Sequence, residues 1–133
     1  MTIQLLLVDD RDVVREELRH VLDLTGTVRL VGEAADGWEA VRQAERLHPD
    51  IVLMDLEMPG LDGLEATRQI KTSGLARAVI VFTVYASATY RQKALEAGAD
   101  AFILKGTDLR ALLDLFEQFA LRWNGPPGAA AGA

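Results

Sequence analysis

The 133-residue sequence contains no cysteine, which excludes disulfide bonds, thiolate metal sites and a thiol nucleophile. It contains no apolar stretch close to the ~20 residues that a membrane-spanning helix needs. Its first residues carry no basic segment ahead of an apolar core, so the sequence predicts no signal peptide. Together these absences predict a cytoplasmic protein with no membrane contact.

Basic residues are in the minority, with 14 Lys and Arg against 20 Asp and Glu and a formal net charge of −6. A chain that binds nucleic acid by itself needs a basic face to neutralise phosphates. The sequence has no basic cluster of that kind, so direct nucleic-acid binding is not expected. The length and a 50% apolar composition suit one domain with its own core.

Apolar runs of strand length alternate with amphipathic segments of helix length, which is typical of βαβ units and a parallel sheet. The predicted strands are Ile3–Val8, Val28–Glu33, Ile51–Met54, Ala78–Phe82 and Ala101–Leu104. The predicted helices are Asp12–Leu24, a segment from Asp36 to residue 47, Leu61–Ser73, Ser87–Ala97 and a segment from Thr107 to Trp123. The mixed composition of the second strand predicts a sheet edge, because strands covered on both faces are continuously apolar.

Right-handed crossovers limit the strand orders that such a chain can adopt. The pattern fits a flavodoxin-like, doubly wound (βα)5 sandwich with a five-stranded parallel sheet of order 2-1-3-4-5. The chain then reverses between the first and third strands, which opens a crevice at their carboxyl ends. We expect a folded domain over residues 1–124. The Gly-, Pro- and Ala-rich residues 125–133 predict a flexible linker or disordered tail.

Polar residues stand at the downstream ends of four predicted strands: the pair Asp9-Asp10, then Asp55, Thr83 and Lys105. In a parallel sheet these ends share one edge. Each pair of carboxylates at ~4 Å costs about 4 kcal/mol at an effective dielectric constant near 20. That repulsion predicts raised pKa values, a bound cation, or both. Among divalent cations, Mg²⁺ suits an all-oxygen site best.

One carboxylate in such a site can act as a nucleophile and form an aspartyl phosphate. Asp55 is the predicted nucleophile because it stands alone at the end of a central strand. Asp9 and Asp10 lie together on one loop and are predicted to hold the metal. The Lys105 ammonium can pair with one phosphoryl oxygen, and the Thr83 hydroxyl can donate to another.

Four motifs follow one another in order: Val8-Asp9-Asp10, the D-x-x-M-P-G-x-D-G stretch of Asp55–Gly63, Phe82-Thr83, and Gly98–Lys105. With these motifs the sequence resembles the receiver (CheY-like) domain of bacterial two-component response regulators, from about Gln4 to Phe119. The run Asp9–Glu16 and the pair Lys105-Gly106, where many receivers have Lys-Pro, are similar to the NarL/FixJ branch.

The resemblance implies that Asp55 accepts a phosphoryl group from a sensor histidine kinase. It implies that Asp10, Asp55 and the backbone carbonyl of Glu57 bind Mg²⁺ directly, and that Asp9 helps through a water molecule. It also implies that Lys105 contacts the phosphoryl group. Such a domain is a phosphorylation-controlled switch, not an enzyme, and promotes only its own phosphotransfer and dephosphorylation.

The same resemblance implies that Thr83 moves toward the phosphoryl group and that Phe102 turns inward. The face of the fourth helix, fifth strand and fifth helix would then bind a second copy of the chain, an effector domain or an effector protein. Relatives in this branch usually carry a helix-turn-helix domain for transcription regulation. The chain is expected to be either a domain excised from such a protein or a stand-alone receiver.

One residue departs from the family pattern. Val84 follows Thr83 where receivers usually have a small Ala or Gly. A branched side chain would narrow access to Asp55, so we expect slower phosphotransfer or dephosphorylation. Glu57 and Tyr85 border the same entrance and are predicted to tune the phosphate lifetime in a similar way.

Three alternatives remain open at this level: a flavin-binding flavodoxin, an aspartate-nucleophile phosphohydrolase, and a receiver that binds partners without phosphate. The acidic loop after the first strand would repel a flavin phosphate, and Glu57 stands where such phosphohydrolases carry a second aspartate. The complete set of receiver residues argues against the third. Outside the site, Asp62 and Asp100 are predicted to be solvated turn residues.

Overall fold

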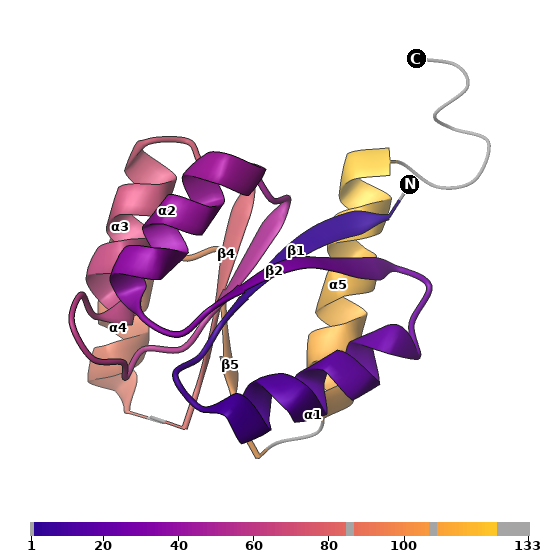
Figure 1. The fold of residues 1–133 in the computed structure, drawn as a ribbon, viewed down its shortest axis with the longest axis horizontal. Helices are drawn as coiled ribbons and strands as arrows, with labels where there is room; N and C mark the ends of the chain where they lie inside the picture. The colour runs from indigo at the N-terminus through magenta and orange to yellow at the C-terminus, as the bar shows by residue number, and fades with distance from the viewer. Residues whose placement is uncertain (1, 85–86, 107–108, 125–133) are drawn as a thin grey trace.

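A computed structural model describes residues 2–84, 87–106 and 109–124, and these residues form five strands and five helices (Figure 1). The strands are β1 (Ile3–Val8), β2 (Val28–Ala34), β3 (Ile51–Met54), β4 (Ala78–Thr83) and β5 (Ala101–Leu104). The helices are α1 (Asp12–Asp23), α2 (Gly37–Leu47), α3 (Gly63–Thr72), α4 (Ala88–Glu96) and α5 (Leu109–Asn124). All five predicted strands are confirmed, with ends that differ by at most one residue.

The sheet is entirely parallel and has the predicted order β2-β1-β3-β4-β5, which places β2 at an edge. Val8 pairs with Met54 at the ends of β1 and β3. Thr83 pairs with Leu104 at the ends of β4 and β5. This register brings the residues after all four strands to the same level of one sheet edge.

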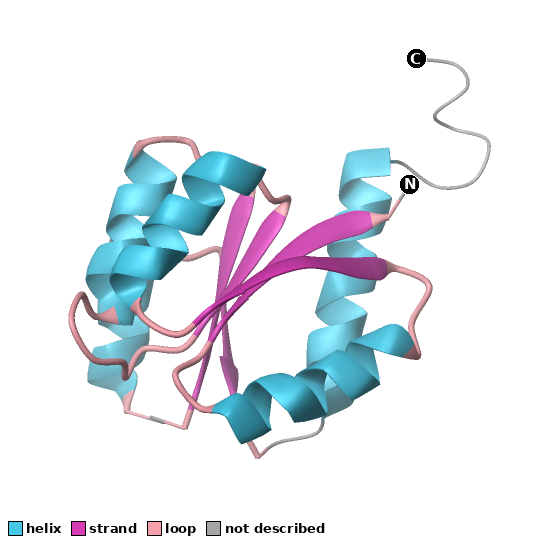
Figure 2. Cartoon of the chain, in the orientation of Figure 1, coloured by secondary structure: helices cyan, strands magenta, loops and turns pink. Residues whose placement is uncertain are grey.

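Helices cover both faces of the sheet, with α1 and α5 on one side and α2, α3 and α4 on the other (Figure 2). Alternate residues of a strand point to opposite faces, so Leu5 and Leu7 pack toward α1 and α5 while Leu6 and Val8 pack toward α2 and α3. Burial on both sides explains why the central strands are continuously apolar. None of the helices in the described ranges is long and apolar enough to cross a membrane.

The start of α2 is a variant of the capping box, in which the N-cap side chain and the side chain three residues later each accept a backbone hydrogen bond. Asp36 caps the helix by accepting a hydrogen bond from the Glu39 backbone N–H at 2.8 Å. The Glu39 carboxylate accepts in return from the backbone N–H of Ala35, at 3.3 Å, instead of that of Asp36. The reciprocal bond therefore closes one residue further upstream, in the loop that follows β2.

Two acidic residues that the sequence assigned to solvated turns have structural partners. Asp62 is the N-cap of α3 and accepts from the Glu65 backbone N–H at 2.9 Å, so α3 begins at Gly63 and not at Leu61. Asp100 Oδ2 accepts from the Val79 backbone N–H at 2.8 Å and from Lys71 Nζ at 3.0 Å. Both residues are exposed and lie outside helices and strands, as predicted, but each side chain also accepts a hydrogen bond from a backbone N–H that was not predicted.

Two other predictions fall outside the described residues. These are the predicted start of the last helix at Thr107, within residues 107–108, and the predicted tail over residues 125–133. The last helix is described from Leu109 and ends at Asn124, close to the predicted end at Trp123.

Candidate functional site

Three carboxylates meet where the chain leaves β1 and β3. Asp9, Asp10 and Asp55 each offer an oxygen, and these oxygens all lie within 4.8 Å of one another. Asp9 and Asp55 are buried, whereas Asp10 is exposed. The order of the strands predicted that these acids meet, and the structure adds that two of them are buried while the third faces solvent.

The backbone around Asp55 is held on both sides. Its N–H donates to the carbonyl of Val8 at 3.0 Å, which continues the β1–β3 ladder by one residue. On the other side, α3 begins so close that a Cβ on Gly63 would lie 2.1 Å from the Asp55 carbonyl oxygen and 2.8 Å from the Leu56 Cα. Only glycine permits this approach, which explains the glycine that ends the D-x-x-M-P-G-x-D-G stretch.

Lys105 reaches the acids from the far end of β5. Its backbone N–H donates to the Thr83 carbonyl at 2.7 Å, so the ladder between β4 and β5 also extends by one residue. Its Nζ donates to Oδ2 of Asp9 and lies 3.6 Å from Oδ1 of Asp55. The side chain is only 10% exposed, so this ion pair is well shielded from solvent.

The surroundings of Asp55 act on its pKa in opposite directions. Burial of the carboxyl is the largest effect and raises its pKa. The Lys105 ammonium lowers the pKa, the Asp9 carboxylate raises it, and a hydrogen bond from the Glu57 backbone and the charge of Arg11 lower it further. The balance leaves the pKa of Asp55 above its ordinary value, so this carboxylate is more basic than a solvated one.

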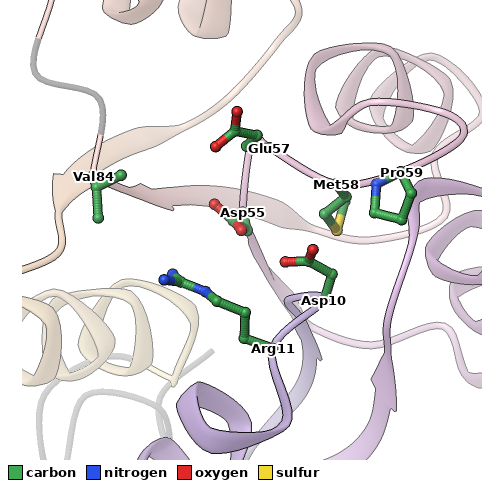
Figure 3. A pocket seen from close by; sticks show the side chains of 7 residues that line it. All are labelled: Asp10, Arg11, Asp55, Glu57, Met58, Pro59 and Val84. Atoms are coloured by element: carbon green, nitrogen blue, oxygen red, sulfur yellow. The ribbon is translucent and has the colours of Figure 1, made fainter.

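Asp55 and Asp10 open into a cleft of about 240 Å³ (Figure 3). Its lining consists of Asp10, Arg11, Asp55, Glu57, Met58, Pro59 and Val84. The loop after β3 supplies one side, and Val84, whose exposed fraction is 57%, supplies another. The cleft is large enough for a small anionic group next to the acids.

The chain is similar in sequence and fold to known proteins. A family model for the response regulator receiver domain matches residues 5–117. The chain belongs to this family. Response regulator protein VraR of Staphylococcus aureus is 40% identical over 114 residues, which are 86% of this chain and 54% of VraR. The chain therefore spans about half the length of the curated relatives it matches.

Solved structures agree with this family. A two-component response regulator of the LuxR family from Aurantimonas sp. SI85-9A1 has a TM-score of 0.84 and 36% identity, over 92% of this chain and 87% of that one. A chain of the CheX–CheY–BeF3–Mg²⁺ complex of Borrelia burgdorferi has a TM-score of 0.78 and 26% identity, over 88% and 89% of the two chains. The similarity to VraR and to a LuxR-family regulator agrees with the predicted NarL/FixJ-like branch.

The remaining predicted site residues differ in their burial and in their position relative to the cleft. Thr83 is fully buried at the end of β4, next to Lys105. Glu57 is exposed on the rim of the cleft. Phe102 lies opposite Val81 in the β4–β5 ladder, is partly buried, and packs outside the cleft lining. Tyr85 lies outside the described residues.

Two arginines that contact Asp9 were not among the predicted site residues. Arg11 donates its backbone N–H to Asp9 Oδ1 at 2.9 Å, and its Nε lies 3.6 Å from the same oxygen. Arg15 donates to the Asp9 backbone carbonyl and pairs with Glu33, Nε to Oε1, at 3.2 Å. The available signal was their position, directly after the acidic pair and one helical turn later.

Receiver domains are signalling switches that bind Mg²⁺ at an acidic pocket, and the donor set of this chain fits such an ion. Asp9, Asp10 and Asp55 supply only oxygen ligands, which Mg²⁺ prefers. Because Asp10 faces solvent while Asp55 is buried, an ion between them would keep part of its water shell. Mg²⁺ normally keeps several waters when one or two carboxylates bind it.

Proposed function

We propose that Asp55 accepts a phosphoryl group from a sensor histidine kinase and that this modification switches a partner-binding face of the receiver. The observation that supports this most strongly is the pairing of a buried, basic carboxylate with a shielded ammonium at the base of one cleft. A nucleophile and a phosphoryl-binding cation are the two parts that the transfer needs.

In the proposed transfer, a carboxylate oxygen of Asp55 attacks the phosphorus of the kinase phosphohistidine. An O–P bond forms and the P–N bond breaks, and the electron pair of the broken bond stays on the imidazole nitrogen as the ring takes up a proton. Lys105 Nζ, 3.6 Å from Asp55 Oδ1, can donate to an oxygen of the transferred group. The receiver acts on no separate substrate and promotes only its own phosphotransfer and dephosphorylation.

We assign Mg²⁺ to Asp10, Asp55 and the backbone carbonyl of Glu57, with Asp9 contributing through a water molecule. When bound, the ion neutralises charge on the incoming phosphoryl group. The oxygens of the three acids within 4.8 Å support this assignment, and so does the Mg²⁺ in the CheY complex of Borrelia. The loop of Glu57 lines the same cleft.

Thr83 and Phe102 are the proposed switch residues. The oxygens of a phosphoryl group carry roughly −1.5 to −2 charges in place of the single carboxylate charge, and they attract the Thr83 hydroxyl and the Lys105 ammonium on neighbouring strands. Thr83 then moves toward the phosphoryl group, and Phe102 turns inward beside it. A shift from 1:99 to 99:1 needs about 5.5 kcal/mol. A few charge-assisted hydrogen bonds of ~1.5–3 kcal/mol each can supply that difference.

The switched surface is the face of α4, β5 and α5, which binds a second copy, an effector domain or an effector protein. Three large apolar side chains on this part of the chain are exposed: Tyr90, Leu95 and Leu121. The similarity to VraR and to a LuxR-family regulator supports an output in transcription regulation, in the cytoplasm. Residues 1–124 would form the receiver and residues 125–133 its linker or tail.

Incubation with Mg²⁺ and acetyl phosphate, followed by intact mass spectrometry, tests the proposal. We expect the wild-type protein to gain one phosphoryl group and Asp55→Asn to gain none. Asp62→Asn is the matched control, because Asp62 caps α3 outside the cleft and asparagine also caps helices well. Equal labelling of wild type and Asp55→Asn would refute the assignment of Asp55.

A further inference from the structure

Arg11 occupies a position that helix formation disfavours. It is the N-cap residue of α1, and its side chain makes no capping hydrogen bond. Helices favour Ser, Thr, Asp or Asn at this position, and a cation opposes the positive end of the helix dipole. Local helix stability therefore does not explain why an arginine follows the acidic pair. Violations of local rules of this kind tend to occur at functional sites.

The Arg11 guanidinium is close to the acids but only loosely held. Its Nε lies 3.6 Å from Asp9 Oδ1, and the side chain is 52% exposed. Asp9 is already well paired without it, because Oδ1 accepts the Arg11 backbone N–H and Oδ2 accepts Lys105. The donors of the guanidinium thus remain available for a further anionic partner.

An anionic partner in the cleft lies within reach of this guanidinium. Arg11 lines the same 240 Å³ space as Asp55 and Asp10, and its side chain extends in Figure 3 below Asp55 and toward Val84. Arg11 and Val84 also line the adjoining hollow beside Lys105. An anion on Asp55 would therefore lie between two cations, with Lys105 from the end of β5 and Arg11 from the start of α1.

We propose that Arg11 is a second cation of the phosphoryl site, which leaves Asp9 and contacts the phosphoryl group once Asp55 carries it. This inference rests on the proposed function of Asp55. A guanidinium suits the role because its planar set of donors matches the oxygens of a phosphoryl group. The modification replaces one carboxylate charge by roughly −1.5 to −2 on the phosphoryl oxygens, which strengthens the attraction for Arg11.

The positive charge of Arg11 has opposite effects on the two ligands of the cleft. It repels Mg²⁺, which the acids attract, and it attracts the phosphoryl group. Removal of the charge should therefore strengthen Mg²⁺ binding and weaken phosphorylation at the same time. A residue that only supported the loop would change both in the same direction.

The test compares Arg11→Gln and Arg11→Lys with the wild-type protein. Mg²⁺ affinity is measured by calorimetric titration, and the rate of phosphoryl gain from acetyl phosphate is measured at saturating Mg²⁺ by intact mass. For Arg11→Gln we expect a rate about fivefold lower and a Kd for Mg²⁺ about twofold lower, since the guanidinium is half exposed and screened. Arg11→Lys keeps the charge and should recover part of the rate.

Arg68→Gln is the matched control. The Arg68 side chain is also 52% exposed and pairs with a carboxylate, Glu65, at 2.8 Å, but it lies on α3 away from the cleft lining. It should change neither quantity. An unchanged rate in Arg11→Gln, or a rate and an affinity that fall together, would overturn the role of Arg11 alone. A wild-type protein that gains no phosphoryl group would overturn the proposed function as well.

Discussion

The Lys105 ammonium donates a hydrogen bond to Oδ2 of Asp9, a residue 96 positions earlier in the chain. Both side chains are almost completely shielded, with exposed fractions of 10% and 2%. The parallel sheet produces this contact because β1 and β5 end at the same edge. The ammonium offsets the unfavourable burial of two carboxylates, Asp9 and Asp55, before any phosphoryl group arrives.

Substitution of Lys105 should therefore lower stability as well as function. Lys105→Met leaves Asp9 and Asp55 buried without their ammonium partner, and breaking a buried ion pair in this way costs about 3 kcal/mol. We expect the free energy of unfolding in urea at pH 7 to fall by about that amount. Lys105→Arg, which keeps the charge, should lose clearly less. A Lys105→Met protein as stable as the wild type would show that the ion pairs of Lys105 make no net contribution to the free energy of unfolding.

The raised pKa of Asp55 makes stability depend on pH. Burial raises the pKa above its value in the unfolded chain, so the folded protein holds a proton more tightly. The group therefore contributes most to stability below its unfolded pKa, and this contribution is lost as the pH rises through the folded pKa. At neutral pH the ionised, buried carboxylate of Asp55 lowers the free energy of unfolding.

Asp55→Asn should accordingly stabilise the protein at pH 7, by on the order of 1 kcal/mol. The advantage should shrink as the pH falls through the folded pKa and vanish below the unfolded one, where aspartate is protonated in both states. Urea unfolding of both proteins across this pH range measures the difference. A constant difference at every pH would mean that ionisation of Asp55 is not the cause.

Much of the fold follows from periodicity in the sequence. The strands were predicted to within one residue because burial on both faces leaves continuous apolar runs such as Ile51–Met54. Helix starts were less accurate, as at Leu61, because the capping residue and not the apolar pattern decides where a helix begins. The hydrogen bonds of Asp100 were not predicted because its partners Val79 and Lys71 are distant in sequence and become neighbours only in the folded protein.

The sequence predicted which residues meet at the candidate site, but not which of them form hydrogen bonds and ion pairs with one another. Strand ends determine which residues share an edge, so the meeting of Asp9, Asp55 and Lys105 followed from topology alone. The sequence did not indicate that Lys105 would bond to Asp9 in preference to Asp55. It also did not reveal Arg11, because the direction of a loop side chain depends on packing that periodicity does not describe.

The close approach of α3 to Asp55 predicts a severe effect of a small substitution. In Gly63→Ala the new Cβ would lie 2.1 Å from the Asp55 carbonyl oxygen, so α3 or the loop after β3 must move. We expect a loss of about 3 kcal/mol in the free energy of unfolding, typical of severe overpacking. Gly26→Ala is the control, since nothing lies within 4 Å of its Cβ position and the change should be nearly neutral. Similar urea midpoints for the two variants would contradict this close packing.

Val84 offers the most direct test of access to Asp55. Its exposed, branched side chain lines the cleft that contains Asp55. Val84→Ala widens the entrance for both the phosphoryl donor and the attacking water. We expect the rates of phosphoryl gain from acetyl phosphate and of its later loss to rise by about threefold each, as better approach geometry lowers a barrier slightly.

The stability of Val84→Ala should change by less than about 0.5 kcal/mol, because Val84 is largely exposed. Val13→Ala is the matched control: Val13 is 66% exposed on α1, is absent from the lining of the cleft, and should leave both rates unchanged. Time courses of intact mass after removal of acetyl phosphate separate gain from loss. If both rates of Val84→Ala equal those of the wild type, the Val84 side chain does not limit access to Asp55.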